Sequence, residues 1–199
     1  MKRIGVLALQ GAFIEHISML NLLCVEAPEV RTPAQLHGLD GLIIPGGEST
    51  TIGKLAATYQ LLAELQALAE RGLPIWGTCA GMILMAKDIG PYEQPLLGLM
   101  DIKVARNAFG RQLDSFEAEL IVPALDAIAK PQEKGKPFPG VFIRAPIIEG
   151  VGQGVEVLAT LEDGTIVAAR ERNLLATAFH PELTVDNRFH RYFLAMTEL

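Results

Sequence analysis

The sequence predicts an α/β fold in which a mostly parallel central sheet is flanked by helices and carries an antiparallel segment at its edge. Apolar runs at residues 41–44, 73–76 and 174–179 have the composition of buried strands, and leucines recur at helical spacing within residues 59–71. Continuous apolar strands that alternate with helices are typical of a parallel sheet covered on both faces.

The amino-terminal half supplies most of this alternation. Residues 3–8 are predicted as a strand, and a helix is predicted to follow Gly11 and to run through Leu23. The strand at 41–44 leads through a glycine-rich loop into a helical segment, and the strand at 73–76 leads into a helix at 82–87. Each strand is therefore expected to return to the sheet through a helix.

After Lys87 the pattern changes to short strands, for which the candidates are residues 102–105, 115–122, 155–161 and 165–170. The Glu162-Asp163-Gly164 segment between the last two candidates predicts a hairpin turn, and thus an antiparallel segment at the edge of the sheet. Residues 129–140 are polar and proline-rich, which predicts a mobile linker. Residues 186–197 are predicted to form a closing helix.

Composition excludes several classes of protein. The chain has 199 residues, 50% of them hydrophobic, so it can bury its own core and is expected to form a single domain over residues 1–199. A net charge of −6 argues against nucleic-acid binding, and no apolar stretch reaches the ~18 residues of a membrane span. Two cysteines do not make a disulfide framework, so we expect a cytoplasmic protein. No Cys/His cluster has the spacing of metal ligands.

The most informative motif is Gly77-Thr78-Cys79-Ala80-Gly81, which lies between a predicted strand and a predicted helix. This arrangement predicts a nucleophile elbow, a tight turn that exposes its central side chain above the sheet edge. The flanking glycines remove the Cβ atoms that would clash in such a turn. At the start of a helix, the thiolate and a developing oxyanion are both favoured by unpaired N–H groups.

A base for this cysteine is offered by His180-Pro181-Glu182, which follows the apolar run at 174–179. If that run is a strand, His180 lies at its carboxyl end, on the edge where open α/β sheets build their sites. Glu182 is placed to turn back and accept from the imidazole. The sequence thus predicts a Cys79-His180-Glu182 relay.

The other cysteine and histidines have simpler interpretations. Cys24 ends a helical pattern with an apolar stripe, which favours a small buried hydrophobe over a nucleophile. His16, His37 and His190 fall in a helix, a polar loop and the closing helix, and each is expected to be an ordinary surface or half-buried residue.

A third motif, Pro45-Gly46-Gly47-Glu48-Ser49-Thr50-Thr51, follows the strand at 41–44. Its glycines permit close approach of the backbone to a ligand, and Ser49 or Thr50 is a candidate cap for the following helix. The loop lacks the lysine of a phosphate-binding loop and the spacing of a dinucleotide fingerprint, so by itself it indicates only a turn.

Together these motifs resemble the class I, or triad, glutamine amidotransferases. The motifs are LIIPGGESTT at 42–51, GTCAG at 77–81 and HPE at 180–182. A narrower resemblance is to the glutaminase subunits of pyridoxal 5′-phosphate synthase. It is carried by GVLALQG at 5–11 with Glu15-His16, by RNAFGRQ at 106–112 and by VFIRAP at 141–146. The chain departs from this family at residues 126–140, where an extended loop is expected.

The resemblance implies roles for individual residues. Cys79 would attack the side-chain amide of L-glutamine, His180 would transfer the proton to the leaving ammonia, and Glu182 would orient His180. The backbone of Gly47 and Ala80 would bind the oxyanion, and Gln10 would lie nearby, facing a partner subunit. The residues that would hold glutamine are Gly47, Glu48, Ser49, Arg106, Ile143 and Arg144. Without the resemblance, both arginines are better explained as surface cations.

The resemblance also implies that the ammonia passes to a (β/α)8-barrel synthase subunit, and that this chain needs no cofactor and no metal. Two alternatives stay open at this point. A stand-alone γ-glutamyl hydrolase or cysteine peptidase of related fold would use the same relay. A non-catalytic assembly subunit would keep the fold alone, although the intact Cys79, His180 and Glu182 argue against it.

Overall fold

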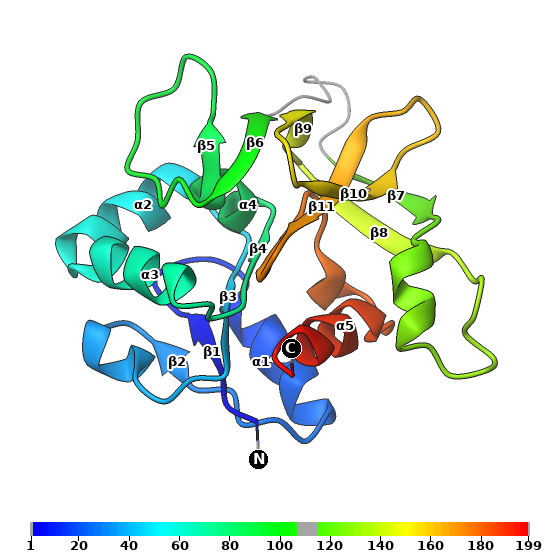
Figure 1. Cartoon of the computed structure of the whole chain (residues 1–199), viewed down its shortest axis with the longest axis horizontal. Helices are drawn as coiled ribbons and strands as arrows, with labels where there is room; N and C mark the ends of the chain where they lie inside the picture. The colour runs from blue at the N-terminus through cyan, green and yellow to red at the C-terminus, as the bar shows by residue number, and fades with distance from the viewer. Residues whose placement is uncertain (1, 107–114, 199) are drawn as a thin grey trace.

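A computed structural model describes residues 2–106 and 115–198, and its central feature is a curled sheet that runs through the whole molecule (Figure 1). The strands follow the order β2-β1-β3-β4-β12-β11-β9-β6-β5, with β10 beside β11. They are β1 (Ile4–Leu7), β2 (Glu29–Val30), β3 (Gly41–Ile44), β4 (Ile75–Thr78), β5 (Ala86–Asp88), β6 (Met100–Ala105), β9 (Ile147–Val151), β10 (Glu156–Thr160), β11 (Ile166–Glu171) and β12 (Leu174–Thr177).

The first five strands in this order are parallel and form the heart of the sheet. Every residue of β1, β3, β4 and β12 is buried. Strands buried on both faces require helices on both sides of the sheet, as the apolar runs predict. The predicted α/β class is therefore confirmed.

Helices cover the two faces of this parallel region (Figure 1). They are α1 (Phe13–Leu22), α2 (Ser49–Thr58), α3 (Leu61–Glu70), α4 (Ala80–Met85) and α5 (Arg188–Met196), with 3-10 turns η1 (Pro33–Leu36), η2 (Pro123–Ala127) and η3 (Pro181–Leu183). Helices α1 and α5 lie side by side on one face, whereas α2, α3 and α4 contact one another on the other. The two described ends of the chain meet, since Lys2 Nζ donates to the Thr197 carbonyl at 2.8 Å.

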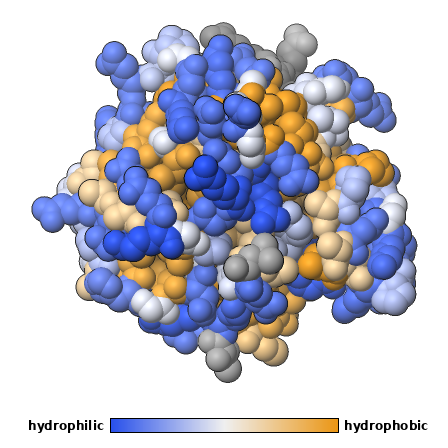
Figure 2. All heavy atoms as spheres, viewed as in Figure 1, coloured by the Kyte–Doolittle hydropathy of each residue, from blue (hydrophilic) through white to orange (hydrophobic). Residues whose placement is uncertain are grey.

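The face that α1 and α5 cover is packed with aromatic rings. Trp76 on β4 is fully buried and lies against Phe189 and Phe193 of α5, and Phe179 packs edge-on against Phe189. Large buried rings contribute much of the burial free energy of a core, so this cluster fixes α5 against the sheet. On the face seen in Figure 2, hydrophilic residues cover most of the surface and apolar residues show between them.

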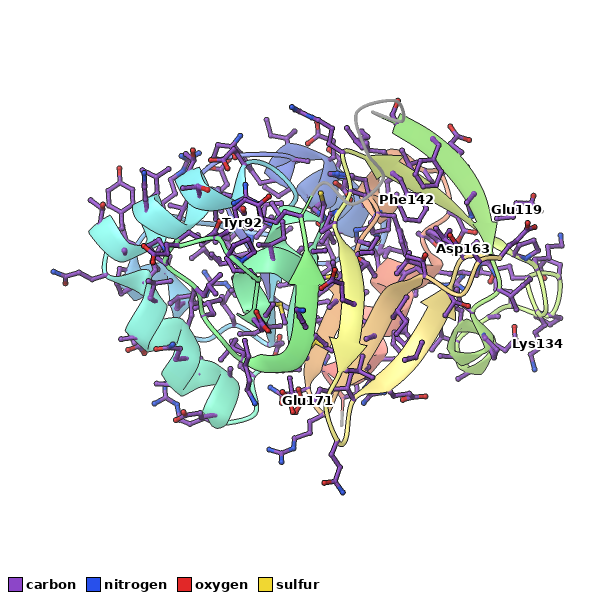
Figure 3. The ribbon with its side chains drawn as sticks, turned by 90° about the horizontal axis from the view of Figure 1, so that it is seen from above. Tyr92, Glu119, Lys134, Phe142, Asp163 and Glu171 are labelled. Carbon is purple, nitrogen blue, oxygen red and sulfur yellow. The ribbon has the colours of Figure 1, made fainter. Side chains whose placement is uncertain are left out.

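The antiparallel portion begins at β11, which pairs antiparallel with β12, β10 and β9. The turn predicted at 162–164 joins β10 to β11, where Leu161 and Thr165 are hydrogen-bonded and Gly164 has φ +85°. The strand predicted at 115–122 is β7 (Ser115–Leu120), but it pairs with β8 (Phe138–Ile143) in a separate two-stranded sheet. Phe142 of β8 points from this ribbon toward the interior (Figure 3).

The segment predicted as a mobile linker is tied down. It follows η2 and ends within β8, and residues between these two elements bond to α5. The Glu133 carboxylate lies 2.6 Å from Arg191 Nη2, and Arg188 donates to the Lys136 and Pro137 carbonyls at 2.8 and 2.7 Å. Lys134 lies at the outer rim of the loop (Figure 3). The loop itself therefore spans residues 128–137, shorter than the 126–140 expected from the sequence.

Other elements also differ from the sequence prediction. The helix predicted at 82–87 is α4, which ends at Met85, because Ala86–Asp88 pairs with β6 as β5. Strands β2, β8 and β9 were not predicted as strands. Residues 107–112 of the RNAFGRQ motif lie outside the described residues. No helix in the described chain is long and apolar enough to span a membrane.

Candidate active site

Cys79 occupies the turn between β4 and α4, with φ 48° and ψ −103°. A non-glycine residue held in such a conformation costs about 1–3 kcal/mol and persists only where the surroundings impose it. Here the Cys79 N–H donates to the Thr177 carbonyl of β12 at 2.8 Å, and the Cys79 carbonyl begins α4 by accepting from Ile83. The turn thus has the geometry of a nucleophile elbow.

The glycines on either side of Cys79 are required by close backbone packing. A Cβ on Gly77 would lie 2.5 Å from the Gly81 carbonyl carbon, and a Cβ on Gly81 would overlap the Ile44 carbonyl oxygen of β3. Neither neighbour is the end of a flexible side chain, so neither can move aside cheaply. The glycines therefore let α4 start directly against β3 and β4.

His180 follows β12 and is buried, with its backbone N–H bonded to the Val141 carbonyl of β8 at 2.8 Å. Its Nδ1 lies 2.7 Å from Glu182 Oε1, because η3 turns Glu182 back toward the ring. Burial alone lowers the pKa of His180, but hydrogen bonds and charge interactions with Cys79 and Glu182 outweigh it and raise the pKa to about 10. This direction favours an imidazolium at His180, the cationic partner that a cysteine nucleophile requires.

Glu182 lies behind His180 and is almost completely buried. Burial raises the pKa of a carboxyl group, but the histidines on either side, His16 and His180, prevail and hold the pKa of Glu182 below its ordinary value. The group is therefore a carboxylate at neutral pH. An anionic Glu182 fixes the Nδ1–H tautomer of His180 and leaves Nε2 for the thiol proton.

The sequence prediction was wrong for two histidines that lie behind Glu182. His16 of α1 and His190 of α5 were expected to be surface or half-buried residues, but both are fully buried. His16 Nε2 lies 3.3 Å from Glu182 Oε2, and His16 Nδ1 lies 3.0 Å from His190 Nε2. Helical spacing could have indicated this burial, because each histidine lies on the same helix face as a buried apolar residue. His16 shares its face with Leu20 on α1, and His190 shares its face with Phe193 on α5.

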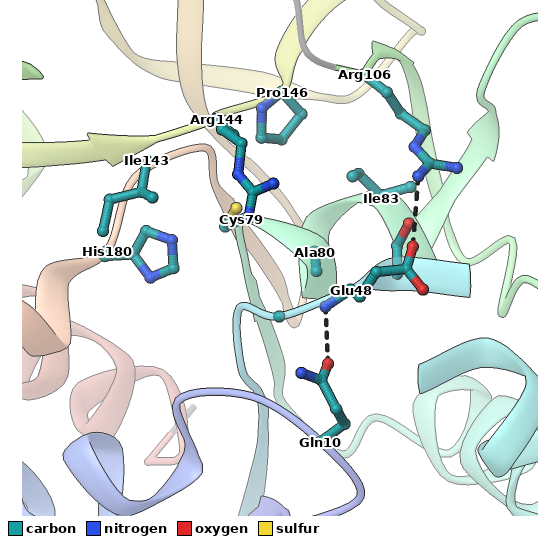
Figure 4. A pocket seen from close by; sticks show the side chains of 12 residues that line it. Gln10, Glu48, Cys79, Ala80, Ile83, Arg106, Ile143, Arg144, Pro146 and His180 are labelled. Atoms are coloured by element: carbon teal, nitrogen blue, oxygen red, sulfur yellow. Dashed lines mark hydrogen bonds and ion pairs between the residues drawn. The ribbon is translucent and has the colours of Figure 1, made fainter. Parts of the chain in front are cut away.

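The glycine loop after β3 closes the site from the other side (Figure 4). A Cβ on Gly46 would overlap the His180 ring and would lie 3.3 Å from Cys79 Cβ. The Gly46 carbonyl accepts from the Ala12 N–H at 3.0 Å. Because N–H and C=O point in opposite directions across a trans peptide, the Gly47 N–H faces away from Ala12. Gln10 Oε1 accepts from the Glu48 N–H at 2.7 Å and holds the other end of the loop.

The loop, the elbow and the end of β8 enclose a cavity of about 370 Å³, within the range of small-molecule sites. Its lining residues come from distant parts of the sequence (Figure 4): Gln10, Gly47, Glu48, Ser49, Cys79, Ala80, Ile83, Arg106, Ile143, Arg144, Pro146 and His180. Every site residue expected from the sequence lines this cavity except Glu182, which supports His180 from behind. Ile83 and Pro146 were not predicted, since apolar lining residues carry no motif.

The two arginines of the cavity differ in their partners. Arg106 stacks on Tyr92 at 4.7 Å, donates to Gln94 Oε1 at 3.0 Å and lies 3.5 Å from Glu48 Oε1. Tyr92 lies beside α2 in Figure 3. Arg144 is exposed, has φ 42° and has no hydrogen-bond or ion-pair partner among residues 2–106 and 115–198. Arg144 is thus the cation that the cavity leaves available for an anionic group.

Glu48, and not Ser49 or Thr50, caps α2. Its carboxylate accepts from the Thr50 and Thr51 N–H groups at 3.1 and 2.7 Å, whereas Ser49 Oγ donates to Gln94. Burial tends to raise the pKa of Glu48, but the hydrogen bonds from Thr51 and Thr50 lower it to about 2. Gln94 was not predicted as a site residue, although its Oε1 accepts hydrogen bonds from Ser49, Thr50 and Arg106.

No metal site is present in the described part of the chain, where no group of three or more His, Cys, Asp or Glu is placed to hold an ion. The cavity presents a thiol, a charged imidazole and, behind the imidazole, an orienting carboxylate. This fold with such an elbow defines the class of triad glutamine amidotransferases.

Comparison with known proteins narrows the class. The model of the SNO glutamine amidotransferase family matches residues 6–199, and the chain belongs to that family. A relative from Herpetosiphon aurantiacus, the pyridoxal 5′-phosphate synthase subunit PdxT, is 61% identical over 97% of this chain and 99% of its own. The subunit of the same name from Dehalococcoides mccartyi is 60% identical over 98% and 97%. A solved structure described as a glutamine amidotransferase is 51% identical, with a TM-score of 0.89 over 98% and 99%.

Proposed function

We propose that this chain is the glutaminase subunit of a pyridoxal 5′-phosphate synthase, which hydrolyses L-glutamine to L-glutamate and ammonia for vitamin B6 biosynthesis. The observation that carries the chemistry is that Cys79 and His180 line one cavity, with Glu182 2.7 Å from His180 on the side away from the cavity. The assignment to this synthase is supported by full-length identity of about 60% to PdxT subunits.

The reaction begins at the thiolate of Cys79. Its sulfur attacks the side-chain amide carbon of glutamine, and His180 gives its proton to the departing nitrogen, which leaves as ammonia. A γ-glutamyl thioester remains on Cys79. Water then attacks this thioester, His180 takes a proton from the water, and glutamate leaves with regeneration of the thiolate.

The oxyanion formed in each step needs hydrogen-bond donors. We assign this role to the N–H groups of Gly47 and Ala80, which line the cavity on two sides of Cys79. Ala80 is the first residue of α4, so its N–H has no partner within the helix. One such donor contributes about 10²–10³ in turnover.

The charged residues around the cavity complement the charges of glutamine. The unpartnered guanidinium of Arg144 is suited to the α-carboxylate of glutamine in a bidentate pair. The Glu48 carboxylate and the main chain near Ser49 complement the α-ammonium, and Arg106 fixes Glu48 from the far side at 3.5 Å. Ile143 adds an apolar wall at the end of β8.

The synthase subunit, a (β/α)8 barrel in this proposal, receives the ammonia directly. Ammonia released to neutral water becomes ammonium, which is no longer nucleophilic, so direct transfer preserves its reactivity. We place the protein in the cytoplasm, which the unpaired cysteines Cys24 and Cys79 support.

The test uses glutamine whose amide nitrogen carries a heavy isotope, with purified chain, synthase partner and an excess of unlabelled ammonium. We expect the label in the pyridoxal phosphate ring nitrogen. Glutamate release without label transfer would instead favour a stand-alone hydrolase, and absence of glutamate release with the partner present would favour an assembly subunit.

A further inference from the structure

The two oxygens of the Glu182 carboxylate have different surroundings. Oε1 faces His180, whereas Oε2 is buried and has no hydrogen bond of good geometry among the described residues. A charged oxygen withdrawn from water without a partner is costly. The group that faces it is His16 Nε2 at 3.3 Å, and both side chains are fully shielded from solvent.

Hydrogen-bond chemistry sets the tautomer of His16. A carboxylate can only accept, so the nitrogen that faces it must carry the proton. His16 Nδ1 is then an acceptor, and it lies 3.0 Å from His190 Nε2, which is the matching donor. In this tautomer His190 Nε2–H donates to His16 Nδ1, and the Nε2–H of His16 lies between two acceptors, Thr78 Oγ1 at 3.2 Å and Glu182 Oε2 at 3.3 Å.

The surroundings keep both imidazole rings neutral and in place. Burial lowers the pKa of His16 and of His190, so neither ring becomes an imidazolium that would compete with His180 for the charge of Glu182. The groups that face His16 are Thr78 Oγ1 of β4 at 3.2 Å and the edge of the Trp76 ring, besides Glu182 and His190. The same ring contacts His190, so a single aromatic side chain supports both imidazoles.

We propose that His16, fixed as the Nε2–H tautomer by His190, is a positioning residue that holds the Glu182 carboxylate in the orientation His180 requires. This inference rests on the proposed triad. Without the His16 donor, the carboxylate can rotate about its last bond, and Oε1 no longer meets His180 Nδ1 in a single geometry. Partners of this kind that orient a group in direct contact with the reacting residue typically change activity by about 10- to 100-fold.

The test compares His16→Met with His16→Gln in the complex with the synthase partner. Methionine fills similar space without a donor, whereas glutamine can return an N–H to the position of Nε2. We expect His16→Met to lower kcat for glutamine hydrolysis by about 10- to 100-fold with KM nearly unchanged, and His16→Gln to restore most of the loss. His190→Leu should give a smaller loss of the same kind, because it frees the tautomer of His16 and leaves its donor.

A matched control is His37→Met, the same substitution at an exposed histidine that does not line the cavity. It should leave turnover unchanged. A second readout is the pH dependence of Cys79 alkylation in a Cys24→Ala background, which reports the charge state of the Cys79-His180 pair. We expect His16→Met to move this profile and His37→Met to leave it in place.

The outcomes distinguish a failure of the positioning role of His16 from a failure of the proposed triad. Full turnover and an unchanged alkylation profile in a folded His16→Met enzyme would overturn the positioning role alone. Equal losses in His16→Met and His16→Gln would also contradict it, since a purely structural role does not distinguish them. Glutamine hydrolysis that survives Cys79→Ala would instead remove the triad on which the inference rests.

Discussion

At the scale of single residues, Cys79 combines a strained backbone with the thiol that we propose as the nucleophile. The strain is a property of the turn, which the hydrogen bond to Thr177 and the close approach of Gly77 and Gly81 impose. An alanine at position 79 would adopt the same backbone. The nucleophile can therefore be removed without changing the architecture around it.

We expect Cys79→Ala to abolish glutamine hydrolysis and to leave folding and partner binding intact. Cys24→Ala is the matched control, and it should have little effect because Cys24 is exposed and does not line the cavity. Steady-state release of glutamate, with thermal unfolding of both variants, checks this expectation. Activity retained in Cys79→Ala, or lost in a well-folded Cys24→Ala, would remove Cys79 from its role.

His180 and Glu182 should differ in severity. His180→Ala removes the proton carrier, whereas Glu182→Ala leaves an imidazole that still samples the right tautomer. We expect Glu182→Ala to retain roughly 10- to 100-fold more turnover than His180→Ala, the gap typical between an orienting carboxylate and its base. The measurement is kcat for both variants against the Cys79→Ala background rate. A larger loss in Glu182→Ala would reverse the ranking.

The positions of Cys79, His180 and Glu182 around one cavity were predictable because each lies in a local motif whose residue types serve a recognisable chemistry. His16, His190 and Gln94 were not, since their importance depends on contacts between segments far apart in the sequence, such as the 174 positions that separate the two histidines. The burial of Cys24 was predicted wrongly. The chain turns at this residue with φ 57°, which points its side chain out of the apolar stripe.

At the scale of elements, α2 shows how one carboxylate serves both a helix and the cavity. Glu48 caps the first turn through Thr50 and Thr51 while its oxygens border the substrate site. A negative cap also interacts favourably with the helix dipole. The start of α2 is thereby tied to the loop that carries Gly47.

The stability contribution of this cap should depend on pH. The folded-state pKa of Glu48 is about 2, below the ordinary value of 4.5. The contribution is therefore fully present above pH 4.5 and is lost as pH falls through 2. Near neutral pH we expect Glu48→Ala to cost about 0.5–2 kcal/mol of unfolding free energy, the usual cost of losing a cap.

Urea unfolding between pH 3 and 7 measures this dependence, with Glu48→Gln to remove the charge alone. The gap between Glu48→Gln and the unaltered chain should narrow as pH decreases. Glu93→Gln, at an exposed position, is the control and should show no such trend. A gap that stays constant or widens toward low pH would mean that the charge of Glu48 does not support α2.

Strands and helices were predicted best where apolar residues form an uninterrupted run or recur at helical spacing. Strands β3, β4 and β12 and helices α1, α3 and α5 come from such segments. Strands β5 and β9 were missed because partners elsewhere in the sheet, and not local composition, decide their conformation, as the pairing of Ala86 with Met100 illustrates. The polar segment before β8 was misjudged for the same reason, since its order depends on Arg188 and Arg191 of α5.

At the scale of the whole molecule, α1 connects two parts of the site. The residues that precede it clamp the glycine loop, through Ala12 to Gly46 and through Gln10 to Glu48. Its second turn carries His16, which faces Glu182. A partner that contacts α1 or the segment before it can therefore act on the oxyanion donor and on the base together.

The hydrogen bonds that Gln10 and Ala12 make with the glycine loop are weak enough for a partner to change the conformation of the loop. The orientation of the Gly46-Gly47 peptide is secured by one hydrogen bond, from Ala12 to the Gly46 carbonyl. A bond of this kind contributes a net 0.5–1.5 kcal/mol, roughly a 2- to 10-fold bias. Glycines on both sides lower the cost of turning the peptide over. A contact with the synthase subunit near Gln10 can thus select the orientation that serves the oxyanion.

We therefore expect the isolated chain to hydrolyse glutamine slowly and the synthase partner to activate it. Because a misdirected oxyanion donor lowers turnover by about 10²–10³, the effect should appear in kcat more than in KM. Steady-state glutaminase kinetics of the chain, alone and with saturating partner, test this. Gln10→Ala, which loses the bond to the Glu48 N–H, should weaken the activation while Cys79 stays reactive toward a small alkylating agent. Equal turnover with and without partner in the unaltered chain would show that the loop is already set, and that glutamine hydrolysis in this protein is not coupled to the presence of an ammonia acceptor.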